Sequence, residues 1–169
     1  MRRLLAALAV LLLLLGSPGA ASASRADPLR ILAFGRVEDP SLVIVAGGAI
    51  TGVGSLAAES VGYRQADRTY HEVDRAHLGA GDLTLSVDGA FDAWPFTLDP
   101  LTCTQHGSLA GTWTITAGTG EYAGVTGHGR LSGRFLTYAA RGPAGCDEAA
   151  VKGFVAGAMV GAVSGTPAH

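Results

Sequence analysis

Short stretches in which apolar and polar residues alternate follow one another from Leu42 almost to the end of this 169-residue chain. In LTLSV (83–87), three apolar residues alternate with Thr84 and Ser86. A period of two places apolar side chains on one face of a β-strand, whereas a helix needs a period of 3.6. Many short strands with regular turn signals predict an antiparallel all-β sandwich or barrel, with helices minor. The 25 glycines favour a barrel, because strand glycines belong at tight bends and close strand contacts.

The strand boundaries follow from turn residues between the apolar runs. Residues 24–29 are interpreted as a polar leader, and the core is expected to span about 42–165. The expected strands are flanked by Gly, Asp or Pro residues. Two of them lie in 42–58 and meet near Gly47 and Gly48, and a hairpin follows in 67–89, with its first arm at about 69–77 and its turn at 78–81. Further strands lie within 94–116, and one strand runs from about 127 to 138.

The stretch GTWTITAGTGEYAGVTGHGRLSGRF (111–135) holds seven glycines and has two interpretations, a phosphate-binding loop or a hairpin. Its spacing GxGxxxG at 118–124 is one residue longer than the dinucleotide fingerprint, and no Lys-Ser/Thr pair follows. The glycines that come next disfavour the helix that such a loop must open. We therefore expect a hairpin, with Leu131 and Phe135 on one strand face and Arg130 and Arg134 on the other.

This stretch, with FTLDPLTCTQHGSLAG (96–111) before it, resembles secreted actinobacterial proteins related to the allene oxide cyclase and dirigent barrels. The resemblance implies a small antiparallel barrel of eight strands that is often oligomeric, so a homo-oligomer is one expected partner. The plant members are an oxylipin cyclase and proteins that guide phenoxy-radical coupling. The bacterial group brings no established chemistry, and no catalytic position of the plant families is carried over.

The N-terminus reads as a secretory signal peptide over residues 1–23. Two arginines precede an apolar run of 12 residues, and small residues end at Ala23. The run is too short for a membrane anchor, which needs roughly 20 residues. Cleavage would leave one secreted domain, 24–169, with 10 basic and 14 acidic residues. Because no basic cluster exists, nucleic acid is not an expected partner.

The two cysteines, Cys103 and Cys146, are expected to form a disulfide, because an exported chain meets an oxidising environment. The bond would close a loop of 44 residues, worth about 4 kcal/mol in the chain-entropy model. A metal or redox pair is the alternative. It has no CxxC motif, and the single CxxH formed with His106 is a weak signal. No metal or cofactor is expected.

One polar strand, TYHEVDRAH (69–77), carries the candidate binding residues. If Val73 faces the interior, His71 and Arg75 share its face, and the acidic residues between them point to solvent. A His–Arg pair in a barrel mouth could bind a carboxylate or polarise a carbonyl. The alternative is a solvated strand whose charges discourage pairing with other sheets. The strand register decides between the two, since a slip of one residue exchanges the faces.

The C-terminal segment KGFVAGAMVGAVSG (152–165) has glycines four residues apart. Such spacing suits either a helix with a small-residue face or a strand. We expect a strand, buried on both faces under a loop or against another subunit, because both faces are apolar.

Three functional hypotheses follow. The preferred one is a non-catalytic secreted barrel that binds a small apolar ligand or a protein partner. The others are a cyclase, isomerase or coupling-guide enzyme, which the family resemblance motivates, and a structural or envelope-associated assembly protein.

Overall fold

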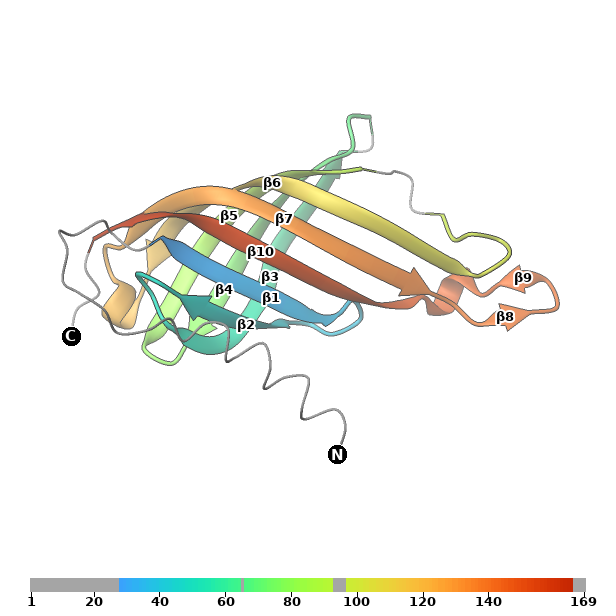
Figure 1. Cartoon of the computed structure of the whole chain (residues 1–169), viewed down its shortest axis with the longest axis horizontal. Coiled ribbons are helices and arrows are strands. Elements are labelled where there is room, and N and C mark those ends of the chain that lie inside the picture. The colour runs from blue at the N-terminus through green and yellow to red at the C-terminus, as the bar shows by residue number, and fades with distance from the viewer. Residues whose placement is uncertain (1–27, 65, 93–96, 166–169) are drawn as a thin grey trace, which may run out of the picture.

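The computed structural model describes residues 28–64, 66–92 and 97–165. The predicted signal peptide lies outside these residues. Eight antiparallel strands close into a barrel in the order β1-β10-β7-β6-β5-β4-β3-β2 (Figure 1). They are β1 (Leu29–Arg36), β2 (Leu42–Gly47), β3 (Gly52–Arg64), β4 (Thr69–Leu78), β5 (Gly81–Phe91), β6 (Thr104–Gly118), β7 (Thr126–Tyr138) and β10 (Lys152–Ser164).

Two short strands and two single helical turns complete the described chain. β8 (Arg141–Gly142) and β9 (Gly145–Cys146) form a small hairpin that extends beyond the barrel end (Figure 1). The 3-10 turns are η1 (Gly120–Tyr122), between β6 and β7, and η2 (Glu148–Ala150), before β10. No helix in residues 28–64, 66–92 and 97–165 is long and apolar enough to cross a membrane.

The glycine-rich stretch is a hairpin, as its spacing predicts. β6 and β7 pair from Thr104 with Tyr138 to Ile115 with Gly127, and η1 connects them. Gly120 has φ +58°, a left-handed conformation that glycine adopts without steric cost. Leu131 is buried, whereas Arg130 and its neighbours on the other face are exposed.

One half of the interior is densely packed around Trp113, which is 1% exposed. Its indole N–H donates to the Arg130 carbonyl oxygen at 3.2 Å. The ring lies against Gly129 and Gly161, which face each other across β7 and β10. A Cβ at Gly161 would stand 2.7 Å from the indole and 2.1 Å from a backbone carbonyl oxygen. These glycines therefore make room for the largest core side chain.

The barrel begins earlier in the chain than predicted. β1 lies ahead of the expected core start at Leu42, and it joins β2 to β10 to close the sheet. Its inward residues Leu29 and Ile31 are fully buried. The outward residues include Phe34, 47% exposed, so the strand lacks the apolar–polar alternation that identified the others.

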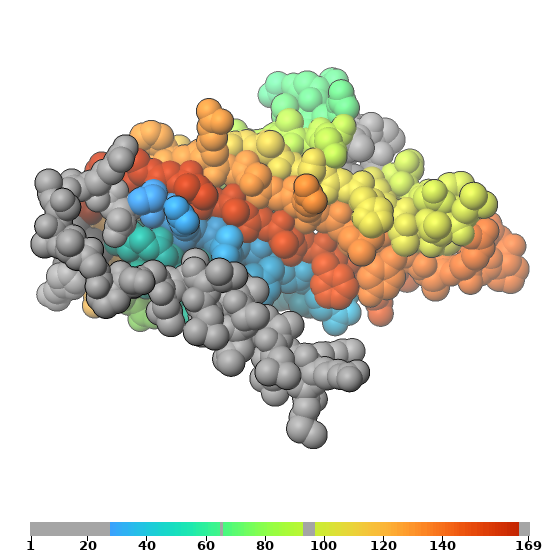
Figure 2. All heavy atoms as spheres, in the orientation of Figure 1, coloured from blue at the N-terminus to red at the C-terminus, as the bar shows by residue number. Residues whose placement is uncertain are grey.

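The C-terminal segment is a strand, β10, as expected, but it is not covered on both faces. Its glycines share the inward face with Met159, which is buried. Phe154 and Val160 point outward and are 54% and 44% exposed. Figure 2 shows the outer face of β10 at the surface between β7 and β1. The prediction of burial on both faces is wrong for the single chain, and cover by a second copy stays a prediction.

Candidate ligand-binding cup

The barrel interior opens at one end into a cavity of about 630 Å³, which we call the cup. It lies where β4, β6 and β10 begin and where β5 and β7 end. Leu56, Val87, Leu131 and Met159, all buried, line its inner part next to the packed half. The remaining wall is mainly apolar and aromatic. An eight-stranded barrel is just wide enough to hold one small ligand when its interior is not filled by side chains.

Two carboxyl groups on β4, Glu72 and Asp74, point into the cup. They stand two residues apart and so share the inward face of the strand. Asp74 is 4% exposed and is the one charged residue among the buried residues that the structure describes. It pairs across the sheet with Ala58 on β3 and Leu85 on β5, so its strand neighbours are apolar.

The two carboxyl groups hold a proton between them. Burial, the adjacent charge of Glu72 and a hydrogen bond to Glu72 raise the pKa of Asp74 to about 8. Burial also raises the pKa of Glu72, while the hydrogen bond from Asp74 opposes that rise. The pair therefore retains a proton near neutral pH, shared through the hydrogen bond between the two carboxyl groups. The two groups titrate as a pair.

An aromatic cluster lines the cup beside these acids. The Phe91 ring centroid lies 4.9 Å from that of Tyr70, 6.2 Å from that of Tyr63 and 6.1 Å from that of Phe135. All four rings line the cup. Burial and then the nearby Glu72 charge raise the pKa of both tyrosine hydroxyls, so these hydroxyls remain neutral donors over the physiological range.

A β-bulge in β3 changes which of its residues face the cup. The register between β3 and β4 shifts from Ala58 opposite Asp74 to Ser60 opposite Val73, which leaves Glu59 as the extra residue. Bulges bend a strand and increase its twist. Beyond the bulge, β3 pairs with β4 as far as Arg64 and carries Tyr63 to the cup, whereas its pairing with β2 stops at Leu56, opposite the first residue of β2, Leu42.

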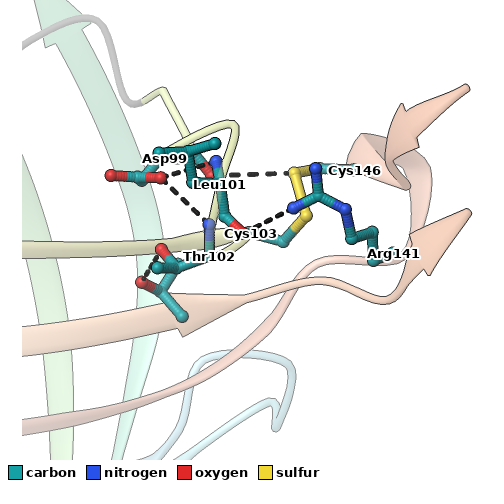
Figure 3. Close-up of a disulfide and its surroundings, with 7 residues drawn as sticks. Asp99, Leu101, Thr102, Cys103, Arg141 and Cys146 are labelled. Carbon is teal, nitrogen blue, oxygen red and sulfur yellow. Dashed lines mark hydrogen bonds between the residues drawn. A yellow bond between two sulfur atoms is a disulfide. The ribbon is translucent and has the colours of Figure 1, made fainter.

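The disulfide secures the loops at the mouth of the cup. Cys103 and Cys146 are bonded, with their Cα atoms 5.4 Å apart, as predicted. Asp99 accepts hydrogen bonds from the backbone N–H groups of Leu101 and Thr102 at 2.7 and 3.0 Å (Figure 3). These bonds lower the pKa of the Asp99 carboxyl. The tied loops place Leu98 and Glu148 on the cup lining.

The structure places the predicted binding residues His71 and Arg75 on the outside of the barrel. The Nδ1 atom of His71 lies 2.8 Å from the Asp88 carboxylate, and Arg75 forms an ion pair with Glu59. Their side chains are 55% and 53% exposed. The condition for an interior His–Arg pair, Val73 facing inward, is not met. The two faces of β4 are exchanged relative to that assumption, so Glu72 and Asp74 face inward instead.

A signal for the correct register was present in the sequence. Ala76 and Leu78, at the end of the same strand, are both fully buried, and they share their face with Asp74. With Leu78 included in the strand, the face of Asp74 carries two aliphatic residues, Ala76 and Leu78, whereas the opposite face carries one, Val73. The arm predicted from the sequence stopped at 77 and assigned Leu78 to the turn.

No family model, curated protein or solved structure matches this chain. In the described ranges no three His, Cys, Asp or Glu side chains gather closely enough to hold a metal ion. The site is therefore characterised by its own geometry.

Proposed function

We propose that this protein is a secreted, non-catalytic binding protein that holds a small, mainly apolar molecule in the cup. The observation that carries the proposal is the cavity of about 630 Å³ inside a closed barrel. Ligand sites in proteins typically measure 300–1,000 Å³ and combine apolar walls with few polar groups. Here the polar groups that line the cup include Glu72 and Asp74, both on β4.

The architecture supports binding by a preformed site. Every strand of the barrel pairs with two neighbours, so backbone hydrogen bonds hold most of the cup wall, although from Ala57 to Arg64 β3 pairs with β4 alone. A rigid site loses little conformational entropy when a ligand enters. The disulfide at the mouth is compatible with an extracellular location, where such bonds persist.

We also propose kinship with the allene oxide cyclase and dirigent barrels. The closed barrel of eight antiparallel strands and the glycine-containing η1 connection between β6 and β7 support it. Antiparallel barrels of this size serve many unrelated functions, so the kinship carries no activity with it.

A fluorescent probe tests the binding proposal. N-phenyl-1-naphthylamine, an uncharged aromatic probe, should gain fluorescence with the purified mature protein and saturate at one site. Val155→Trp fills the cup, because Val155 lines it from β10. Val160→Trp is the matched control, since Val160 lies on the same strand but points outward. Binding that Val155→Trp abolishes and Val160→Trp retains supports the proposal, whereas equal binding by both variants contradicts it.

A second candidate is an acid–base enzyme of the cyclase or isomerase type, favoured by the Glu72–Asp74 pair. A carboxyl group with a pKa raised to about 8 in an apolar site can exchange protons with a bound substrate near neutral pH. 5-Nitrobenzisoxazole reports such a group, because a base removes its ring proton and the N–O bond then opens to a coloured phenolate. Turnover at pH 9 that Asp74→Asn abolishes would support an enzyme. Turnover equal in protein and variant would exclude this role for the pair.

A further inference from the structure

We propose that the cup selects an organic cation, an amine in its ammonium form attached to an apolar body. This inference rests on the proposed binding function and names the chemistry of the ligand.

The described lining of the cup is acidic. Four acidic residues, Asp39, Glu72, Asp74 and Glu148, line it together with one basic residue, Arg36. Arg36 stands at the mouth and is already paired with Glu38 at 2.6 Å, with 48% of its side chain exposed. An apolar cavity with this charge disfavours a carboxylate or phosphate ligand and favours a cation.

Glu72 and Asp74 have no cationic partner within the described chain. None of its ion pairs includes Glu72 or Asp74, although the exposed acids Asp67 and Glu59 each have one. The hydrogen bond of Asp74 runs to a second carboxyl group. Buried charges in proteins are normally paired, and two adjacent carboxyl groups are the arrangement that a cation would compensate.

The aromatic rings of the cup are the second feature that favours an ammonium group. Tyr63, Tyr70, Phe91 and Phe135 line the same cavity as the acids. Both tyrosines are near Glu72, since its charge contributes to the raised pKa of each hydroxyl. Aromatic faces attract ammonium groups, and the attraction is stronger when the cation is desolvated. Carboxylates beside aromatic rings therefore favour an ammonium group over a neutral hydroxyl.

The apolar part of the ligand would contact the inner wall of the cup. The inner wall formed by Leu56, Val87, Leu131 and Met159 offers no polar side chain. A hydrocarbon or aromatic body can lie against it while the ammonium group meets Glu72 and Asp74. Because an ammonium group would favour ionised Asp74, binding should release a proton below pH 8. The other titratable groups that line the cup are Arg36, Asp39, Glu148 and the two tyrosines.

Calorimetry with three probes of one shape tests the inference: 4-phenylbutylamine, 4-phenylbutan-1-ol and 4-phenylbutyrate. We expect the amine to bind the mature protein at least tenfold more tightly than the alcohol, and the carboxylate to bind most weakly. Titrations in buffers of different ionisation enthalpy should show proton release with the amine alone. Glu72→Gln/Asp74→Asn should reduce amine affinity to that of the alcohol, and Glu72→Gln alone should reduce it severalfold. Asp88→Asn, an outward acid that is 69% exposed, is the charge-matched control and should change nothing.

The outcomes separate the two proposals. If alcohol and amine bind equally, or if the amine preference survives in the double variant, the cation inference is wrong and the binding function stands. If no probe binds, at any concentration up to its solubility, both are contradicted. Circular dichroism of each variant confirms that the barrel is retained.

Discussion

The Glu72–Asp74 pair should make the barrel less stable as the pH rises, and Asp74→Asn should remove most of that dependence. The pKa of Asp74 is about 8 in the folded chain, against an ordinary value of 3.8. Between these values the folded state binds more protons than the unfolded state, so stability is highest at low pH and is lost as the pH rises towards 8. Each pH unit costs about 1.4 kcal/mol, which gives about 4 kcal/mol between pH 5 and pH 8.

Urea denaturation at pH 5, 6, 7 and 8 measures this difference. The free energy of unfolding of the wild type should fall by about 4 kcal/mol more than that of Glu72→Gln/Asp74→Asn across the series. Asp74→Asn alone should give a smaller slope than the wild type, because Glu72 keeps part of its raised pKa. Asp88→Asn, on the outer face, should follow the wild type. If the free energy of unfolding changes with pH equally in the wild type and the double variant, the two acids do not share a proton inside the barrel.

Four further predictions concern the fold. Gly161→Ala should lower the free energy of unfolding by about 1–3 kcal/mol, because its methyl group would stand 2.1 Å from a carbonyl oxygen. Gly47→Ala, with no atom within 4 Å of the added Cβ, should be neutral or slightly stabilising in the same denaturation assay. Replacing Cys103 and Cys146 together by alanine should cost about 4 kcal/mol, and an unchanged melting temperature would contradict the chain-entropy argument. Asp99→Asn should speed reduction of the disulfide by dithiothreitol at neutral pH, since the carboxylate holds the turn before Cys103, and an unchanged rate would contradict this role.

Local patterns were sufficient to predict most of the strands. The Trp113 and Ile115 face of β6 is buried, and the threonine face is exposed, because both follow from a simple period of two. The hairpin after β6 was predictable from its glycines, whose spacing suits neither a phosphate loop nor a helix. The disulfide followed from the presence of two cysteines in a chain expected to be exported.

The remaining features depend on contacts distant in sequence. β1 was missed because Leu32 and Phe34, on its outward face between Arg30 and Arg36, are apolar and interrupt the alternation. The prediction exchanged the two faces of β4, because it took Val73 as an interior residue. The cup could not be predicted at all, since its volume depends on how the barrel closes and on where the large side chains stop filling it. The functional interpretation changed with that one-residue shift, from a His–Arg pair expected inside the barrel to an inward pair of acids.

Carboxyl-carbon NMR of selectively labelled protein tests the central claim most directly. Following the Asp74 and Glu72 side-chain signals from pH 4 to pH 10 measures the protonation of each group within the folded barrel. The arrangement inside the cup predicts an Asp74 signal that still reports a protonated carboxyl at pH 6.5 and has its midpoint near pH 8. A midpoint near pH 4 would mean that Asp74 faces water, which would contradict both the register of β4 and the acidic interior of the cup.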